Sequence, residues 1–571
     1  MIWINRRALA ALFVVASIAC IDSNAVHADE TVGRLLSAMP ADAFLVVYVE
    51  NPRQVLPPSL LEPIFKSISK NEAGAREMLD ALREIPGGFA MGIVPPPKFD
   101  WSHNTEILVA MALDRPDATF ADWFEKRMFP AITASWNNDD LKLLKREGGL
   151  AIGRKQGDRT PNDFSFAWKD GLAFGSNKTN RVLAWHRGEY PKKSFLTLPG
   201  LRRSLRSMPK DSGVRVLINP KEIRRAFPNP MPQSWDEMMM KLLAPDDIEF
   251  VAADLGWDRN CVRLTATASL AEECKGVAHV LARPSTDPQC LGVFPPDFCM
   301  VGRVAFPTAQ SAADGLYALT DLIDPTISQE YHEDMSAFKS NYGVNWDAGF
   351  LAQLVHEVAF GLRVDFTRKS PIGWAAVAPL ADRAIFDAEL NRLIAAFELP
   401  VDKSEKDGLP IHTNREGAPF SFAVVRDFLV VADAPETIND VAKNLDRKQA
   451  EPAGPRLRRF SKRLASPNQL AAMIDLQMLS EKAPFIPFAA GAKFGPLISR
   501  GNFGMALSGK DRTATFEIVW DPGRPDSKEG GEVADHESLA ALTELVAETL
   551  LKAREEAKRT IAMAQMRNIA M

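Results

Sequence analysis

The chain has 571 residues, of which 46% are hydrophobic and 25% charged, and its formal net charge is -5. This length exceeds what one hydrophobic core usually serves, so two or more domains are expected. Because there is no excess of basic residues to neutralise phosphates, the composition argues against a nucleic-acid partner.

Residues 1–28 are predicted to form a signal peptide. Arg6 and Arg7 supply positive charge, residues 8–19 an apolar core, and Ala28 ends a small-residue cleavage site. The apolar run is about a dozen residues long, whereas roughly 20 are needed to cross a bilayer. A lipid anchor on Cys20 is the alternative, but the leucine that usually stands three residues before the cysteine is absent. We therefore expect a periplasmic or extracellular protein with no transmembrane segment after signal removal.

A stretch near the start of the mature chain returns later in a looser form. Residues 39–52 combine a Pro-x-Asp turn, an apolar run and a closing proline, and residues 294–307 repeat that pattern. Both prolines of the first stretch, Pro40 and Pro52, recur 255 positions later. The sequence therefore predicts an internal duplication.

A second match indicates that the copies extend further. Residues 164–174 and 420–430 each contain two apolar runs around a charged turn, as a β-hairpin requires, and they lie 256 positions apart. Strands that alternate with helical stretches are typical of an α+β fold. We expect two tandem repeated modules over 31–285 and 286–530, each a mainly antiparallel sheet packed with helices.

A long amphipathic helix is predicted after the second module, over residues 534–571. Leucines and alanines fall on one stripe of this segment, and glutamates, lysines and arginines lie opposite. Packing against the rest of the chain is one reading of that stripe. Self-association through the helix is a second, so an oligomer is an open alternative, and binding to a membrane surface is a third.

Four cysteines follow the signal peptide, and all fall near the junction of the predicted modules. In an exported chain they are candidates for disulfides, in any of three pairings, and free buried thiols are the alternative. A zinc site is disfavoured because no Cys-x-x-Cys pair is present. The candidates are Cys261, Cys274, Cys290 and Cys299.

No spacing typical of a catalytic, metal or cofactor site was found. The chain has no Gly-x-Ser-x-Gly elbow, no phosphate-binding loop and no His-Glu-x-x-His motif. We expect no cofactor and no metal. Two loops that combine prolines with aromatic residues are candidates for contact with a protein or another envelope component. Their aromatic residues are Phe99, Trp101, Phe227 and Trp235.

The opening stretch Leu36–Pro52 and the hairpin Phe164–Ser176 resemble an exported bacterial family, domain of unknown function 3352. Members begin with a Leu-Pro-Ala-Asp turn and an apolar strand; here Met39 stands in place of the leucine. The resemblance covers most of the mature chain and implies extracytoplasmic location, but it implies no activity, cofactor or catalytic residue.

These observations favour a non-enzymatic extracytoplasmic binding or scaffold protein. Two alternatives remain open at this stage. One is an envelope hydrolase with its site at the seam between the modules, which would require convergent carboxylates or a Ser-His pair. The other is a carrier of an apolar ligand, which would hold its ligand between the sheet and the helices of one module.

Overall fold

The computed structural model describes residues between 28 and 521, with its longer gaps at 50–76, 96–104, 155–163, 227–244 and 483–500 and several shorter ones. The signal peptide, apart from its last residue, and the predicted helix over 534–571 therefore lie outside the described residues. So do the predicted contact residues Phe99, Trp101, Phe227 and Trp235.

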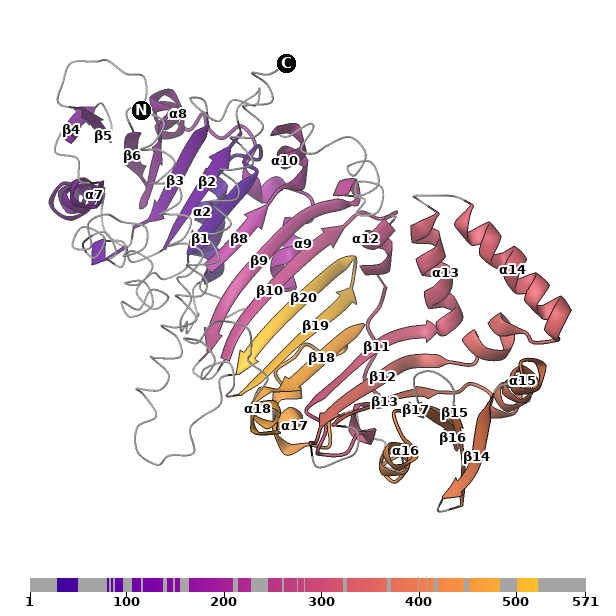
Figure 1. Cartoon of the computed structure of the whole chain (residues 1–571). Helices are drawn as coiled ribbons and strands as arrows, with labels where there is room; N and C mark the ends of the chain where they lie inside the picture. Colours follow the sequence, from indigo (N-terminus) through magenta and orange to yellow (C-terminus); the bar gives the residue numbers. More distant parts are fainter. Residues whose placement is uncertain are drawn as a thin grey trace, which may run out of the picture. The chain divides into compact units, whose positions relative to one another are not determined.

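All 20 described strands belong to one antiparallel sheet, seen as the coloured arrows of Figure 1. The predicted fold class, two tandem modules each with its own sheet plus a long C-terminal helix, is therefore wrong. Apolar alternation marks where strands lie but does not show where a sheet ends, because a border strand can pair on both sides. The predicted domain limits, 31–285 and 286–530, stay a prediction.

The described residues group into two compact units. The first unit contains the described residues up to Pro228 together with those of Phe250–Leu264. The second unit contains the described residues of Asn229–Glu249 and Thr265–Gly523. Ten strands come from the first half of the chain: β1 (Leu45–Val49), β2 (Phe89–Val94), β3 (Glu106–Ala112), β4 (Leu141–Arg146), β5 (Gly149–Arg154), β6 (Phe164–Lys169), β7 (Leu172–Ser176), β8 (Val214–Ile218), β9 (Ile248–Asp258) and β10 (Cys261–Leu270).

Ten further strands come from the second half: β11 (Met300–Thr308), β12 (Val355–Val364), β13 (Ile372–Pro379), β14 (Val401–Lys406), β15 (Leu409–Asn414), β16 (Ser421–Val425), β17 (Phe428–Ala432), β18 (Leu470–Asp475), β19 (Asn502–Lys510) and β20 (Thr513–Asp521). Here β20 also pairs with β10.

The two sets of strands have the same order. Hydrogen bonding gives β4-β5-β6-β7-β3-β2-β1-β8-β9-β10 in the first and β14-β15-β16-β17-β13-β12-β11-β18-β19-β20 in the second. The register also agrees. Leu45 of β1 pairs with Ile218 of β8, and Met300 of β11 pairs with Ile474 of β18.

Local turn chemistry explains the hairpins predicted from the sequence, which are present as β6–β7 and β16–β17. Asp170 and Gly171 take φ values of 54° and 69°. A two-residue turn with both central residues in the left-handed region matches the twist of the two strands, and Asp-Gly favours it.

The helices and helical turns of the first unit are α2 (Ala28–Ala38), α6 (Asp117–Trp123), η1 (Phe124–Met128), α7 (Phe129–Trp136), α8 (Thr179–His186), η2 (Phe195–Thr197), α9 (Leu201–Arg206) and α10 (Pro220–Ala226). They contribute to two apolar clusters. One contains Val47 with Phe120 and Phe124, and the other contains Tyr48 with Leu35 and Leu201. Since Val47 and Tyr48 are neighbours on one strand, their side chains point to opposite faces, so both faces of the sheet are covered here.

The helices and helical turns of the second unit are η3 (Pro245–Asp247), α12 (Gly276–Leu281), η4 (Leu291–Val293), α13 (Ala309–Thr320), α14 (Ile327–Tyr342), η5 (Asp347–Leu351), α15 (Arg383–Ala396), α16 (Pro435–Ala442), α17 (Pro455–Ser461) and α18 (Leu476–Lys482). Capping sets several of their ends. Thr308 accepts a hydrogen bond from Ser311 N to start α13, and α14 ends at Gly343 with a φ of 70°.

Candidate interaction surface

Over six strands of the sheet in the second unit, the central rows of one face carry only apolar side chains. The register of β13, β12, β11, β18, β19 and β20 aligns these side chains in rows that cross the strands. We call the surface the open apolar face. It consists of Trp374, Leu362, Met300, Ile474, Phe503 and Trp520 in the first row, Ala376, Phe360, Gly302, Ala472, Met505 and Ile518 in the second, and Val358, Val304, Leu470, Leu507 and Phe516 in the third.

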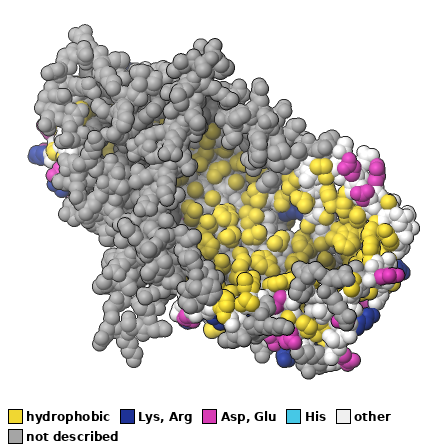
Figure 2. All heavy atoms as spheres, in the orientation of Figure 1, with side chains coloured by type: hydrophobic (Ala, Val, Ile, Leu, Met, Phe, Trp, Pro, Cys, Tyr) yellow, Lys and Arg dark blue, Asp and Glu magenta, His cyan; other side chains and the backbone are white. Residues whose placement is uncertain are grey.

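Several of these side chains are exposed to solvent. Val304 is 43% exposed, and Trp374 and Phe516 are each 37% exposed. Figure 2 shows the apolar side chains gathered over this part of the sheet, with most charged side chains at its margins. Large contiguous apolar surfaces of this kind are unusual on a soluble protein and mark binding sites.

Helices bound the open apolar face at both ends of the strands (Figure 1). At one end, Leu281 of α12 packs against Ala514, which lies two residues before Phe516. At the other end, Met478 of α18 packs with Leu362 and Val364. The face therefore has defined limits along the strand direction.

Five charged residues of the same strands point to the opposite side of the sheet and are buried there, whereas Lys510 at the end of β19 is exposed. Each of the five has a partner in the layer of helices and loops that covers that side. Glu517 accepts a hydrogen bond from Ala465 N at 2.7 Å, and Arg363 donates to Thr437 of α16 at 2.6 Å. These buried residues are Arg303, Glu357, Arg363, Asp475 and Glu517.

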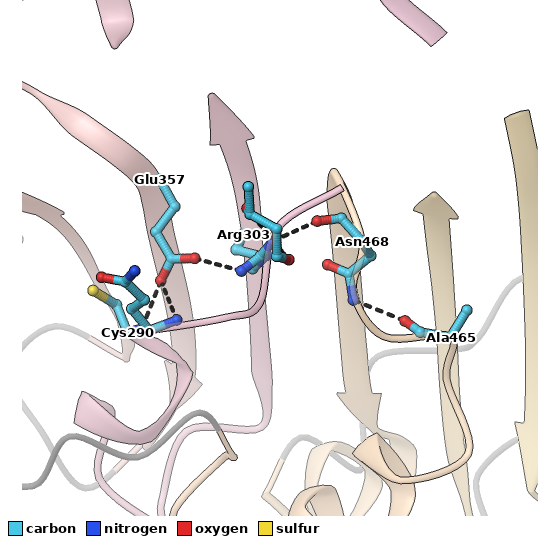
Figure 3. Close-up of polar contacts among 7 residues, drawn as sticks. Cys290, Arg303, Glu357, Ala465 and Asn468 are labelled. Carbon is cyan, nitrogen blue, oxygen red and sulfur yellow. Dashed lines mark hydrogen bonds and ion pairs between the residues drawn. The ribbon is translucent and has the colours of Figure 1, made fainter. Parts of the chain in front are cut away.

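The centre of this buried layer is the ion pair between Arg303 and Glu357 (Figure 3). Nη1 of Arg303 lies 2.7 Å from Oε2 of Glu357, and Nη2 donates to the backbone oxygens of Thr286 and Asn468. Glu357 also accepts from the backbone N–H of Cys290. Both side chains are at most 1% exposed. The pair fastens the segment around 286–290 to the sheet, and burial lowers the pKa of Arg303.

The first unit differs at the equivalent positions. Leu45, Val47 and Val49 of β1 stand where Met300, Gly302 and Val304 stand in β11, and none is more than 7% exposed. Phe120 of α6 and Phe124 of η1 belong to the same buried cluster. The same strand arrangement thus has a covered apolar face in one unit and a partly exposed one in the other.

None of the four predicted disulfide cysteines forms a disulfide in the part of the chain that the structure describes. Cys261, Cys290 and Cys299 are buried, and Cys274 is half-buried. Burial raises the pKa of Cys290 and of Cys299, and the carboxylate of Glu357 raises that of Cys290 further. Disulfide formation between any of them stays a prediction.

Within the described part of the chain, no cluster of three or more His, Cys, Asp and Glu residues is placed to bind a metal ion. The helices that the structure describes are also all too short or too polar to cross a membrane.

Sequence reasoning missed the open apolar face. The signal was a partial alternation, for example apolar Met300, Gly302 and Val304 around Arg303, with a further apolar residue at Val301. Charged residues of a strand normally face water. The pattern therefore favours burial of the face that carries Val304 and exposure of the face that carries Arg303, whereas the structure has the opposite arrangement. The buried partners of Arg303 come from distant parts of the chain, which the local pattern does not contain.

Comparison with known proteins gives little further information. No family model and no curated protein matches the chain. Three crystal forms of TP0453 were found among solved structures, at 12% to 13% identity and TM-scores of 0.25 to 0.26. Each covers 43% of this chain and 82% to 85% of the TP0453 chain. The resemblance to domain of unknown function 3352 stays a prediction.

Proposed function

We propose that the protein is an exported, non-enzymatic binding protein that holds an apolar ligand or partner on the open apolar face. The observation that carries this proposal is that apolar and charged side chains lie on opposite faces of the same sheet. Every side chain of the open apolar face is apolar, whereas five charged residues of the same strands are buried on the other side. The only side-chain hydrogen-bond donors on this face are the indole N–H groups of Trp374 and Trp520. Such a surface loses few hydrogen bonds to water when it binds an apolar partner.

The dimensions of the face suit a ligand or a short segment of a partner. Six strands spaced by ~4.8 Å and three rows spaced by ~6.8 Å give an area of about 24 Å by 14 Å. At ~25 cal/mol per Å² of apolar area, covering it would supply several kcal/mol. The exposed side chains Val304, Trp374 and Phe516 would lose the most contact with water.

The main buried polar cluster supports a binding role over a hydrolytic one. Arg303, Glu357 and the groups around them are sealed from solvent, and their hydrogen bonds join segments of the fold. A catalytic pair must reach a substrate. A substrate cannot reach this cluster, because its charged side chains are buried.

Two parts of the proposal depend on other observations. Export is supported by the sequence of residues 1–28 alone. Internal duplication is supported by the repeated prolines 255 positions apart and by the equal strand order of the two sets of strands.

The test is binding of the uncharged dye Nile red to purified protein, followed by fluorescence. We expect the wild-type protein to bind the dye and Val304→Asp to bind it about tenfold more weakly, because a buried charge replaces an apolar contact. The matched control is Ile385→Asp on α15, which changes a side chain of similar exposure, 45%, away from the face. Equal dye binding by wild type and Val304→Asp, with Ile385→Asp unchanged, would reject the proposal.

A further inference from the structure

An arginine borders the open apolar face at the end formed by α12. Gly509 has the same side-chain direction as Leu507, Met505 and Phe503, so a side chain there would extend the face. Instead, the backbone oxygen atoms of Arg283 and Leu281 lie against Gly509 on this side. The backbone of Arg283 is fixed by Gln469, whose side chain donates to its oxygen.

The guanidinium of Arg283 has little to compensate its charge. Its Nη2 lies against Gly315 of α13 and makes one long hydrogen bond, 3.5 Å, to the Ser311 backbone oxygen. No carboxylate of the described residues lies within ion-pair distance of it. The side chain is half-buried, so water compensates its charge only in part. An anion placed here would gain a charge-assisted hydrogen bond.

We infer that the open apolar face binds the hydrocarbon chain of a long-chain carboxylate, a fatty-acid anion, with its carboxylate at Arg283. This inference rests on the proposed function and names the class of ligand. The planar guanidinium can donate two parallel hydrogen bonds to a carboxylate. The chain then runs along β19 past Leu507, Met505 and Phe503.

The length of the face agrees with this ligand. From Gly509 to Phe503 the strand rises about 20 Å at ~3.4 Å per residue. One acyl chain spans half of the ~30 Å bilayer core, or about 15 Å. A second copy of the protein fits less well, because the area of about 24 Å by 14 Å is well under the ~800 Å² per partner of a stable interface.

The experiment is isothermal titration calorimetry of the full chain with two probes, dodecanoate and dodecan-1-ol. They share one hydrocarbon chain and differ in charge. The variants are Arg283→Met, Val304→Asp and, as a control, Arg187→Met, which removes an exposed arginine from α8's C-terminal end in the first unit. Near-ultraviolet circular dichroism confirms that each variant is folded.

We expect Arg283→Met to bind dodecanoate about tenfold more weakly and dodecan-1-ol as tightly as wild type does, because only the charged contact is lost. Val304→Asp should weaken both probes, and Arg187→Met neither. Equal binding of dodecanoate by wild type and Arg283→Met would overturn the inference while leaving the proposed function standing. Nile red binding without binding of either probe, together with a dimer that Val304→Asp dissociates, would overturn it in favour of a second copy. Failure of all three probes would reject the proposed function itself.

Discussion

Arg303 and Glu357 form an ion pair 2.7 Å long on neighbouring strands, and neither side chain reaches solvent. Removing one partner would leave the other charge buried without compensation. Variants of this pair therefore test how much the ion pair contributes to the stability of the covered side of the sheet.

We expect Arg303→Met to lower the free energy of unfolding by about 3 to 5 kcal/mol, because Glu357 keeps a buried charge. The double variant Arg303→Met with Glu357→Gln should cost clearly less than the two single changes added together. Urea unfolding of the four proteins measures the coupling. Additive losses would show that the two side chains act independently.

Asp475 should make stability depend on pH. Its Oδ1 accepts from Met478 N at 2.8 Å to cap α18, while Oδ2 is buried without a hydrogen-bond partner. Burial raises the pKa of this carboxyl above its usual range. The folded state therefore binds this proton more tightly than the unfolded chain, and the stability contributed by Asp475 falls as the pH rises through that range.

Asp475→Asn keeps the capping oxygen and removes the charge. We expect its unfolding midpoint, relative to wild type, to be higher at pH 7 than at pH 3. Asp475→Ala loses the cap as well and should be destabilised by about 0.5 to 2 kcal/mol at low pH, where the charge of wild type is also absent. A pH-independent difference between Asp475→Asn and wild type would contradict this assignment.

The cysteines should react with a thiol reagent in a defined order. Burial raises the pKa of Cys274, Cys290 and Cys299, but Cys274 is only half-buried, whereas Cys290 and Cys299 are fully buried. Because the thiolate is the reactive form, we expect iodoacetamide to modify Cys274 first in the native protein. Mass spectrometry of peptides identifies the sites. Modification of all four only after unfolding and reduction would instead indicate the disulfides predicted from the sequence.

The two faces of the sheet should differ in their tolerance of added methyl groups. Gly504 points to the covered side, where a Cβ atom would lie 2.6 Å from the Phe460 ring and 3.0 Å from the Ala472 backbone oxygen. We expect Gly504→Ala to cost about 1 to 3 kcal/mol through overpacking. Ala472→Val on the open apolar face adds more volume and should change stability by under about 0.5 kcal/mol. Thermal unfolding compares the two, and equal losses would mean that both faces are packed alike.

Local features of the fold could be predicted from the sequence, while its long-range pairing could not. The β6–β7 hairpin follows from residues adjacent in the chain, because Asp170 and Gly171 suit its turn. The continuity of the sheet depends on which distant strand pairs with β20. Backbone hydrogen bonds between strands do not require particular side chains, so the sequence does not show which distant strands pair.

Which face of the second unit's sheet is covered was even harder to predict from the sequence than the pairing of distant strands. Tyr48 of β1 and Arg303 of β11 occupy equivalent positions, one register step after Val47 and Gly302. A buried tyrosine is ordinary, but a fully buried arginine is rare unless paired. Its partners, Glu357 and the Thr286 and Asn468 backbone oxygens, lie up to 165 residues away in the chain. The sequence pattern alone therefore favoured solvent for Arg303 and core for Val304.

The distribution of charge across the sheet also bears on how the protein behaves in solution. Because five charged side chains of these strands are buried on the covered side, the open apolar face itself has little charge to keep two molecules apart. The solubility of the protein should then depend on whether a ligand covers the open apolar face. If the proposed ligand covers this face, the ligand-free protein should precipitate at concentrations at which the ligand-bound protein stays in solution. A purification yield that rises with added ligand would be the sign of this effect.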